Sequence, residues 1–233
     1  MKSVIAFLAL AVLAVPQQVY GAIGCTLSNP AEDLKYLYPE MTTFKEDLSE
    51  LPRLKDGAAL FKGLKARLGS DLDPIYETYE TPYTVYSVFK GSNKIGVVHG
   101  VNVPGKGGVI QVFLSLDPVT AEVKSFFFQR LESRAARQLR SKEFRAQFTG
   151  LTLGDFYKHD YYTAVEPGAK ADRVAAVKPP PSLDASGQHD YAASLRGIRK
   201  NLILLDFFVY GKRFEPYFER AKQAAEKAKA RKE

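Results

Sequence analysis

Residues 82–131 read PYTVYSVFKGSNKIGVVHGVNVPGKGGVIQVFLSLDPVTAEVKSFFFQRL, and this stretch determines the predicted fold. Its apolar residues recur at alternate positions in four runs, which is the period of a half-buried β-strand. The expected strands are residues 83–89, 95–103, 110–116 and 123–131. Turn-forming residues separate them at Gly91-Ser92-Asn93, at residues 105–108 and at Asp117-Pro118. Consecutive strands joined by tight turns predict an antiparallel meander.

Helical patterns flank this predicted sheet. The clearest helix start is Ser28-Asn29-Pro30, where a capping side chain precedes proline and two acids. Further helices are expected at residues 58–68, after Ser141, at residues 190–205 and at residues 214–231, whereas residues 167–188 are expected to form an irregular loop. The chain is therefore predicted to have an α+β fold, with a central antiparallel sheet of about four to five strands and flanking helices.

The first residues have the layout of a secretory signal peptide. Lys2 precedes twelve apolar residues at positions 4–15, and small residues follow at Gly21, Ala22 and Gly24. Twelve residues rise only about 18 Å as a helix, which is short of the roughly 30 Å hydrocarbon core of a membrane. We therefore expect residues 1–24 to be a signal peptide, and the protein to be exported, either periplasmic or anchored to the outer side of the membrane.

The single cysteine, Cys25, lies where processing would occur, and two interpretations stay open. Ala22-Ile23-Gly24-Cys25 is similar to a lipobox, in which Cys25 would carry the lipid of a lipoprotein. Alternatively, ordinary cleavage after Gly21 or Ala22 leaves Cys25 near the new terminus. A lone cysteine cannot form an intrachain disulfide, and it excludes CxxC redox chemistry and cysteine-ligated zinc.

The chain has a formal net charge of +7, and many of its cations lie near the end of the chain. Residues 220–232 read RAKQAAEKAKARK, which predicts either a solvated helix end or a surface attracted to anionic lipid headgroups. Nucleic acid is not expected as a partner, because no recognised binding motif is present. After the signal peptide, we expect a helical segment at 25–81, the α+β domain at 82–211 and a basic C-terminal helix at 212–233.

The three histidines, His99, His159 and His189, show no metal-ligand spacing, and no GxSxG elbow is present. A hydrolase using His159 with Asp155 or Asp160 would need a nucleophile that the sequence does not identify. The glycine-rich residues 105–108 could offer backbone N–H groups to an anion, but a hairpin turn explains them more simply.

The stretch Gly107-Gly108-Val109-Ile110-Gln111-Val112-Phe113-Leu114-Ser115-Leu116-Asp117 resembles the FMN-binding domain found in the G subunit of the Rnf complex and the C subunit of sodium-pumping NADH:quinone reductase. In that family the next strand runs into a Glu-Thr motif, and Glu132-Ser133 stands at that place here. Residues 144–150 (FRAQFTG) and 34–44 (LKYLYPEMTTF) also resemble the family's short helix and its N-terminal helix. The resemblance covers roughly residues 34–205.

The family's Ser-Gly-Ala-Thr motif, whose threonine can carry FMN through a phosphoester, corresponds to Ser186-Gly187-Gln188-His189. His189 stands at the threonine's position, and an imidazole cannot form a hydroxyl phosphoester. Residues 134–137 (RAAR) replace the family's Pro-Gly-Leu-Gly after the Glu-Thr motif. The resemblance therefore implies noncovalent FMN, with Ser186, Gly187 and His189 near the phosphate and Glu132 near the flavin ring.

The function implied is that of an exported flavoprotein that relays electrons in a membrane-associated redox system. Its expected partners are membrane redox proteins or an envelope complex, and no catalytic residue is assigned, since the cofactor does the chemistry. The alternative is a flavin-free binding or scaffold module of the same fold in an envelope complex.

Overall fold

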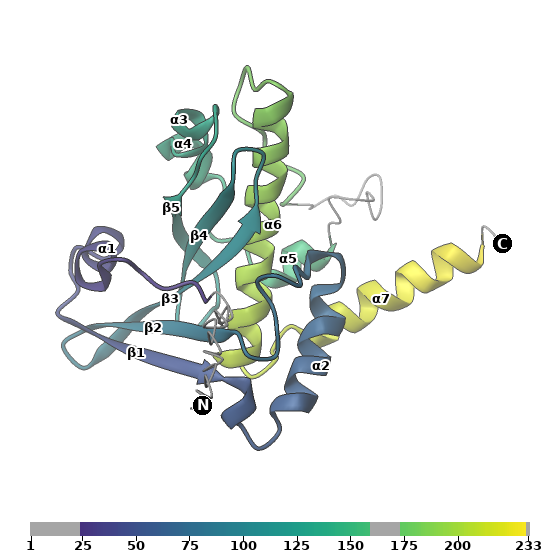
Figure 1. Cartoon of the computed structure of the whole chain (residues 1–233), viewed down its shortest axis with the longest axis horizontal. Helices are drawn as coiled ribbons and strands as arrows, with labels where there is room; N and C mark the ends of the chain where they lie inside the picture. Colours follow the sequence, from purple (N-terminus) through teal and green to yellow (C-terminus); the bar gives the residue numbers. More distant parts are fainter. Residues whose placement is uncertain (1–23, 159–172, 232–233) are drawn as a thin grey trace, which may run out of the picture.

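The computed structural model describes residues 24–158 and 173–231, and its centre is a five-stranded antiparallel sheet in the order β1-β2-β3-β4-β5 (Figure 1). The strands are β1 (Thr43–Glu50), β2 (Pro82–Lys90), β3 (Asn93–Pro104), β4 (Val109–Leu116) and β5 (Val123–Arg130). The predicted α+β class is confirmed, and so is the meander of four strands between residues 82 and 131.

Strand β1 corrects the expectation that residues 25–81 form a helical segment. It pairs with β2 from Thr43 opposite Phe89 to Glu50 opposite Pro82, so the sheet begins well before residue 82. Its sequence, TFKEDLSE, shows no clear alternation of apolar and polar residues. Charged side chains are typical of edge strands, where they discourage pairing with other chains. Because they interrupt the alternation of apolar and polar residues, β1 cannot be recognised from the hydrophobic pattern of the sequence.

Seven α-helices and two short 3₁₀ helices are present in the described residues. They are α1 (Pro30–Leu37), η1 (Leu51–Arg53), α2 (Gly57–Leu68), η2 (Gly69–Asp71), α3 (Ala136–Leu139), α4 (Lys142–Ala146), α5 (Leu153–Lys158), α6 (Ala185–Phe208) and α7 (Glu215–Ala230). Ser141 caps α4 as expected, since its side chain accepts a hydrogen bond from Phe144 N. Helix α6 begins at Ala185, inside the stretch expected to be a loop, because Asp184 caps it.

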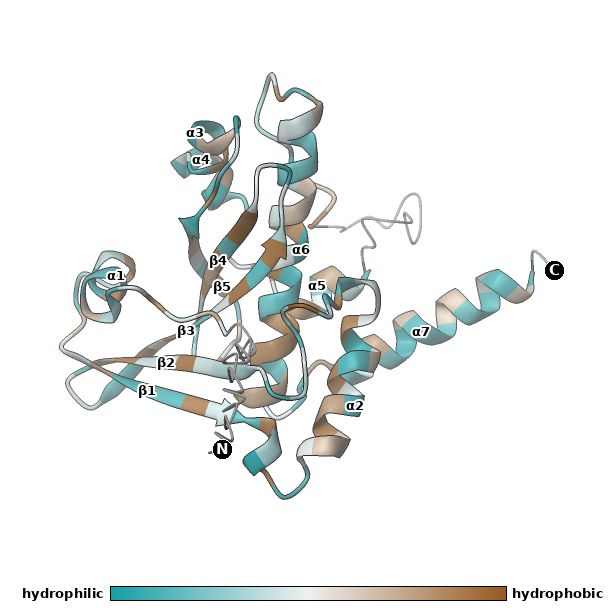
Figure 2. Ribbon diagram, viewed as in Figure 1, coloured by the Kyte–Doolittle hydropathy of each residue, from teal (hydrophilic) through white to brown (hydrophobic). Residues whose placement is uncertain are grey.

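The two faces of the sheet pack against different helices (Figures 1 and 2). Helix α6 lies along β3 and β4 and closes the larger hydrophobic core. Helix α1 covers the other face, where Leu34 and Tyr38 pack with Tyr86, Val98 and Phe113. A Cβ at Gly96 would lie only 2.0 Å from Tyr38 Oη, so glycine is required for Tyr38 to reach Ser115 Oγ at 2.5 Å.

A buried ion pair joins α2 to α6. Arg67 Nη1 lies 2.7 Å from Asp206 Oδ2, and both side chains are almost wholly buried. Arg67 Nε also donates to Tyr157 Oη at 3.0 Å, which brings α5 into the same contact. Asp206 in turn accepts from the backbone N–H of Phe214, just before α7. The two side chains therefore hold four helices together at one end of α6.

Helix α7 extends away from the rest of the molecule (Figure 1), and its outer turns are mostly hydrophilic (Figure 2). Its first turns contact the body through partly buried Tyr217, Phe218 and Ala221, whereas residues 222–227 are exposed. Among the described residues, no helix combines the length and apolar composition that a membrane span needs.

We predict that Arg67→Ala lowers the free energy of unfolding by about 3–5 kcal/mol, because it leaves the carboxylate of Asp206 buried without its partner. Urea denaturation followed by circular dichroism would measure the change. Lys62→Ala changes an exposed residue on the same helix, and its free energy of unfolding should stay within about 0.5 kcal/mol of that of the parent protein.

The double variant Arg67→Ala/Asp206→Ala should be less destabilised than the sum of the two single variants, since the pair is removed together. Additive effects of the two substitutions would contradict a direct coupling between these side chains.

Candidate functional site

Three segments that are distant in sequence meet at one end of the sheet: the β3–β4 turn, the residues after β5, and the start of α6. The backbone N–H of Lys106 in the turn donates to Asp190 Oδ1 at 2.7 Å. A Cβ at Gly107 would lie 2.1 Å from the backbone oxygen of Glu132, so the turn also touches the segment after β5. The turn therefore connects the two regions that hold all four residues predicted to bind flavin.

The first turn of α6 has free hydrogen-bond donors. Asp184 Oδ1 accepts from Gly187 N at 2.7 Å, which satisfies one of the N–H groups that a helix start leaves unpaired. Within the described part of the chain, the N–H groups of Ala185 and Ser186 have no hydrogen-bond partner. The side chain of His189 is 53% exposed. This turn can therefore offer two N–H groups, a hydroxyl and an imidazole to an anion.

Asp190 places a buried carboxylate beneath the same turn. Its Oδ1 accepts from Lys106 N and lies 3.4 Å from His189 Nδ1, while its Oδ2 is buried with no hydrogen-bond partner. This negative charge opposes an anion at the helix start, and His189, which is 3.4 Å from Asp190, can offset it only when its imidazole is protonated. The residues present thus fit a phosphate through backbone N–H groups, and they provide no threonine hydroxyl at position 189 for a phosphoester.

Glu132 lies beside the turn and is half exposed. Its Oε1 accepts two hydrogen bonds from Arg130, at 2.9 Å from Nε and 2.6 Å from Nη2. A Cβ at Gly108 would meet Glu132 Oε2 at 2.9 Å, and Gly108 has a φ of +144°, a conformation that favours glycine. The close packing of the turn against Glu132 therefore explains the glycine pair. The turn joins the antiparallel strands β3 and β4, as the hairpin interpretation predicts.

The hydrolase alternative involves residues that lie mostly outside the described chain, since His159 and Asp160 fall within the undescribed residues 159–172. Asp155 has a local structural role: its Oδ2 accepts from the N–H and the hydroxyl of Thr152, both at 2.8 Å. Arg173 Nη1 also lies 3.4 Å from this carboxylate. In residues 24–158 and 173–231, no group of three His, Cys, Asp or Glu side chains could hold a metal ion.

A buried ionic cluster that the sequence analysis missed joins α6 to the chain between α2 and β2. Lys200, which is fully buried, lies 2.7 Å from Glu77 and 2.9 Å from Asp73. Arg196 reaches Asp73 at 2.7 Å, and Arg199 reaches Asp71 at 3.3 Å. Burial raises the pKa of Glu77, although Lys200 opposes that effect.

The sequence does contain a pattern that points to this cluster. Arg196, Arg199 and Lys200 stand at the i, i+3 and i+4 spacing within α6, so that they share one face of the helix next to its apolar stripe. Polar side chains on a core-facing stripe require partners, because burying them without hydrogen bonds is costly. Which partners satisfy them depends on tertiary structure.

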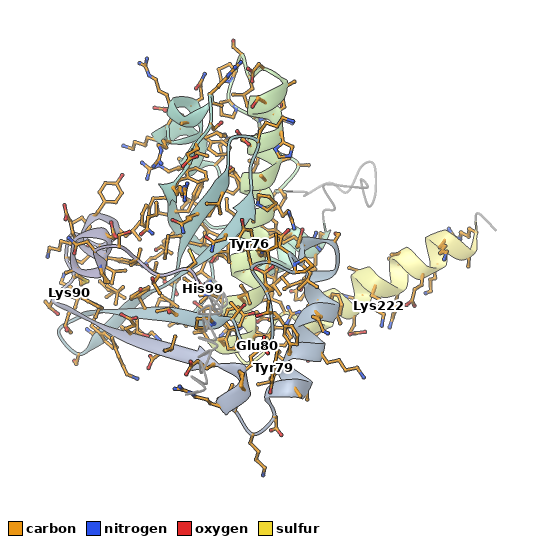
Figure 3. The ribbon with its side chains drawn as sticks, viewed as in Figure 1. Tyr76, Tyr79, Glu80, Lys90, His99 and Lys222 are labelled. Atoms are coloured by element: carbon orange, nitrogen blue, oxygen red, sulfur yellow. The ribbon has the colours of Figure 1, made fainter. Side chains whose placement is uncertain are left out.

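His99 lies in the interior of the molecule on β3 (Figure 3), and Asn201 determines its tautomer. Asn201 Nδ2 donates to the backbone oxygens of Val112 and Gly197, so its Oδ1 accepts from His99 Nδ1 at 2.8 Å. Nδ1 therefore carries the proton. Burial lowers the pKa of His99 to about 4, against the opposing effect of the Asn201 hydrogen bond.

A small cavity of about 10 Å³ borders His99 and is lined also by Cys25, Tyr83 and Asn102. Its size corresponds to about one water molecule, so it has no room for an organic substrate. A neutral histidine beside a cavity of this size has a structural role, as expected from the sequence for each histidine taken alone.

Cys25 packs in the smaller core with Leu27, Leu34 and Tyr86, and burial raises the pKa of its thiol to about 12. A thiol with this pKa is an unreactive nucleophile at neutral pH. Lipidation of Cys25 stays a prediction, and it would require the sulfur to leave this packing. The expected signal peptide lies outside the described residues except for Gly24.

No protein-family model matches this chain, and no curated protein matches it in sequence. The resemblance to the FMN-binding domain therefore stays a prediction that rests on the motifs quoted from the sequence.

We predict that His99 makes the protein less stable as the pH falls from about 6.5 to about 4. The unfolded chain binds a proton on histidine near pH 6.5, whereas the folded chain resists it until about pH 4. The contribution of His99 to the free energy of unfolding is fully present above the unfolded pKa of about 6.5. By pH 4 the loss due to this residue reaches about 3 kcal/mol. Urea denaturation at a series of pH values measures it.

His99→Asn serves as the matched variant, because its amide can donate from nearly the position of Nδ1. It should be less stable than the parent protein at pH 7 but show a flatter decline between pH 6.5 and 4. The other titrating groups, including Glu77, are shared by both proteins, so equal slopes would contradict the assignment to His99.

Proposed function

We propose that this chain is an exported FMN-binding protein that holds the flavin noncovalently and relays electrons within a membrane-associated redox system. The observation that carries the proposal is the contact between the β3–β4 turn, the segment of Glu132 and the first turn of α6. These are three of the places where the sequence resembles the FMN-binding family, and they lie some 25 to 80 residues apart in the chain.

The phosphate of FMN would bind at the start of α6. The N–H groups of Ala185 and Ser186 lie at the positive end of a 24-residue helix, and an anion there is stabilised by these donors and by the helix dipole. The Ser186 hydroxyl and His189 add donors, and Gly187 allows α6 to approach Ala135, since a Cβ there would be 3.1 Å from the Ala135 Cβ. Glu132 would face the ring.

A flavin-free scaffold of the same fold is the second candidate, and Asp190 favours it. This buried carboxylate, together with the Asp184 cap, puts two negative charges around the turn that would receive the phosphate. In that case the N-terminal turn of α6 is only a capped helix start, and the protein would act through its surface in an envelope complex.

We predict that the purified protein binds FMN with a flavin absorption band, and that acid precipitation releases the flavin into the supernatant. Flavin retained in the pellet would indicate a covalent link at another residue. The absence of any flavin band after adding FMN would favour the scaffold candidate.

Ala185→Pro tests the phosphate site, because it removes one free N–H at the first helical position, where proline is well tolerated. Asp184 has a ψ of 177°, which also suits a residue before proline. We expect about tenfold weaker binding of FMN and unchanged binding of riboflavin, which lacks the phosphate.

Lys142→Pro is the matched control, since it makes the same change at the start of α4, after Ser141 with a ψ of 149°. Its FMN affinity should stay within about twofold of the parent. Equal losses in both variants would contradict a phosphate site at α6.

We further propose that the protein associates with the membrane, through a lipid on Cys25 or through the basic side chains of α7. Lys222 lies on α7, which extends away from the sheet (Figure 3), and further exposed cations follow at Lys227, Lys229 and Arg231. Each cation near an anionic surface contributes about 1 kcal/mol, which falls with ionic strength.

We predict that Cys25→Ser in the full chain releases the protein from the membrane fraction if the lipid is the anchor. If the variant stays bound, the lipoprotein interpretation is wrong. Retention that 1 M salt removes, and that Lys222→Gln/Lys227→Gln/Lys229→Gln abolishes, would assign the contact to α7.

A further inference from the structure

A second pocket lies at the outer edge of β5, away from the four residues predicted to bind flavin. Its volume is about 260 Å³, and it is lined by Tyr36, Phe127, Phe128, Arg140 and Arg145. Tyr36 comes from α1, the phenylalanines from β5, and the arginines from the end of α3 and from α4. These elements share one side of the molecule (Figure 1).

The strand itself holds the two arginines in place. Arg140 Nη1 donates to the backbone oxygen of Phe128, and Arg145 Nη1 donates to that of Phe126 at 3.3 Å. Carbonyl groups of alternate residues point to the same edge of a strand, and β5 is the last strand of the sheet. The arginines therefore cover the open edge, which prevents an extended peptide from pairing with it.

Most of the hydrogen-bonding capacity of these guanidinium groups stays available. Each guanidinium has five N–H donors, and one of each group is used in the bonds to β5. Arg145 Nε is buried and has no hydrogen-bond partner. Within residues 24–158 and 173–231, no carboxylate forms an ion pair with Arg140 or Arg145.

The two positive charges are close enough to affect each other. Burial lowers the pKa of Arg140, and the charge of Arg145 lowers it further. Two adjacent cations without an anionic partner are stabilised by an anion placed between them. Planar guanidinium groups suit carboxylate, sulfonate or phosphate oxygens in particular, because their parallel N–H groups can bond two oxygens at once.

The remaining walls are aromatic. The ring of Tyr36 meets that of Phe127 edge-on at 6.5 Å, and Phe127 stacks on Phe113 at 5.5 Å, which holds it rigidly. Arg140 lies 5.9 Å from the centre of the Phe128 ring. Tyr36 is 62% exposed, which is unusual for a large aromatic side chain in this protein. Such walls favour a flat apolar body beside the charged group.

We propose that this pocket binds a small organic anion, in which a carboxylate, sulfonate or phosphate group is attached to a flat body of one or two rings. The anionic group lies between Arg140 and Arg145, and the rings contact Tyr36 and Phe127. A volume near 260 Å³ is slightly below the range of about 300–1,000 Å³ that ligand pockets usually show, which limits the ligand to this size. The proposal is independent of flavin binding at α6.

The test uses 8-anilinonaphthalene-1-sulfonate, in which the sulfonate is attached to a flat two-ring naphthalene that also carries an anilino ring. Its fluorescence rises in apolar surroundings. The chain contains no tryptophan, so protein emission interferes little with the titration. We expect saturable binding, and we expect Arg140→Gln/Arg145→Gln to weaken it at least tenfold. Arg134→Gln/Arg137→Gln, which removes two exposed arginines of the same region, should change the affinity less than twofold.

N-phenyl-1-naphthylamine has the same rings without the sulfonate and isolates the contribution of charge. Its affinity should be equal in the parent protein and in Arg140→Gln/Arg145→Gln. An equal loss of sulfonate binding in both arginine pairs would overturn the proposal, because it would show a diffuse attraction. A loss of the neutral probe together with the sulfonate would overturn the role of the arginines as an anion site.

Tyr36→Ala keeps the test decisive if the arginine variants fold poorly, since this exposed side chain contributes little to the core. It should weaken both probes while circular dichroism stays unchanged, and unchanged affinities would overturn the proposal. Ala185→Pro should leave the binding of both probes intact. This distinguishes failure of the anion pocket from failure of the proposed flavin site.

Discussion

The buried amine of Lys200 is the constraint on which the arrangement of this protein depends. Helix α6 crosses the sheet along β3 and β4, and an unpaired ammonium group at that depth would be strongly destabilising. Asp73, Glu77 and the backbone oxygen of Asn102 satisfy it. The chain between α2 and β2 must therefore lie against α6, and that contact in turn brings Asp71 to Arg199. One charge thus couples a helix, a loop and a strand.

The polar side chains in the middle of α6 are hydrogen-bonded inside the protein. Groups that can bind a ligand therefore lie at the start of α6 and at the edge of the sheet. Asn201 and Lys200 have their partners in the core, whereas the first turn keeps two N–H groups without partners. The two edge strands, β1 and β5, are protected from pairing with another strand in different ways. Charged side chains along β1 deter pairing, while at β5 Arg140 and Arg145 bond backbone carbonyl groups of the strand and line an aromatic pocket.

The region predicted to bind flavin combines features that oppose each other. Free N–H groups and the helix dipole attract an anion, and the carboxylates of Asp184 and Asp190 repel one. His189, which replaces a threonine of the resembling family, is the side chain that can shift this balance toward a noncovalent phosphate. The pocket at β5 has no comparable opposition, because its arginines have no acidic partner among the described residues.

The sequence by itself determined the four strands between residues 82 and 131, the main helices and the α+β class, because alternation, helical spacing and caps are local properties of the chain. Through motif resemblance it also predicted that Glu132, Ser186, Gly187 and His189 bind flavin, which stays a prediction. It did not reveal β1, whose charged side chains hide its strand period, or the partners of Lys200 and His99. Only the tertiary structure decided these, and it alone placed Arg140 and Arg145 beside Tyr36, since burial and pairing depend on contacts between residues far apart in the chain.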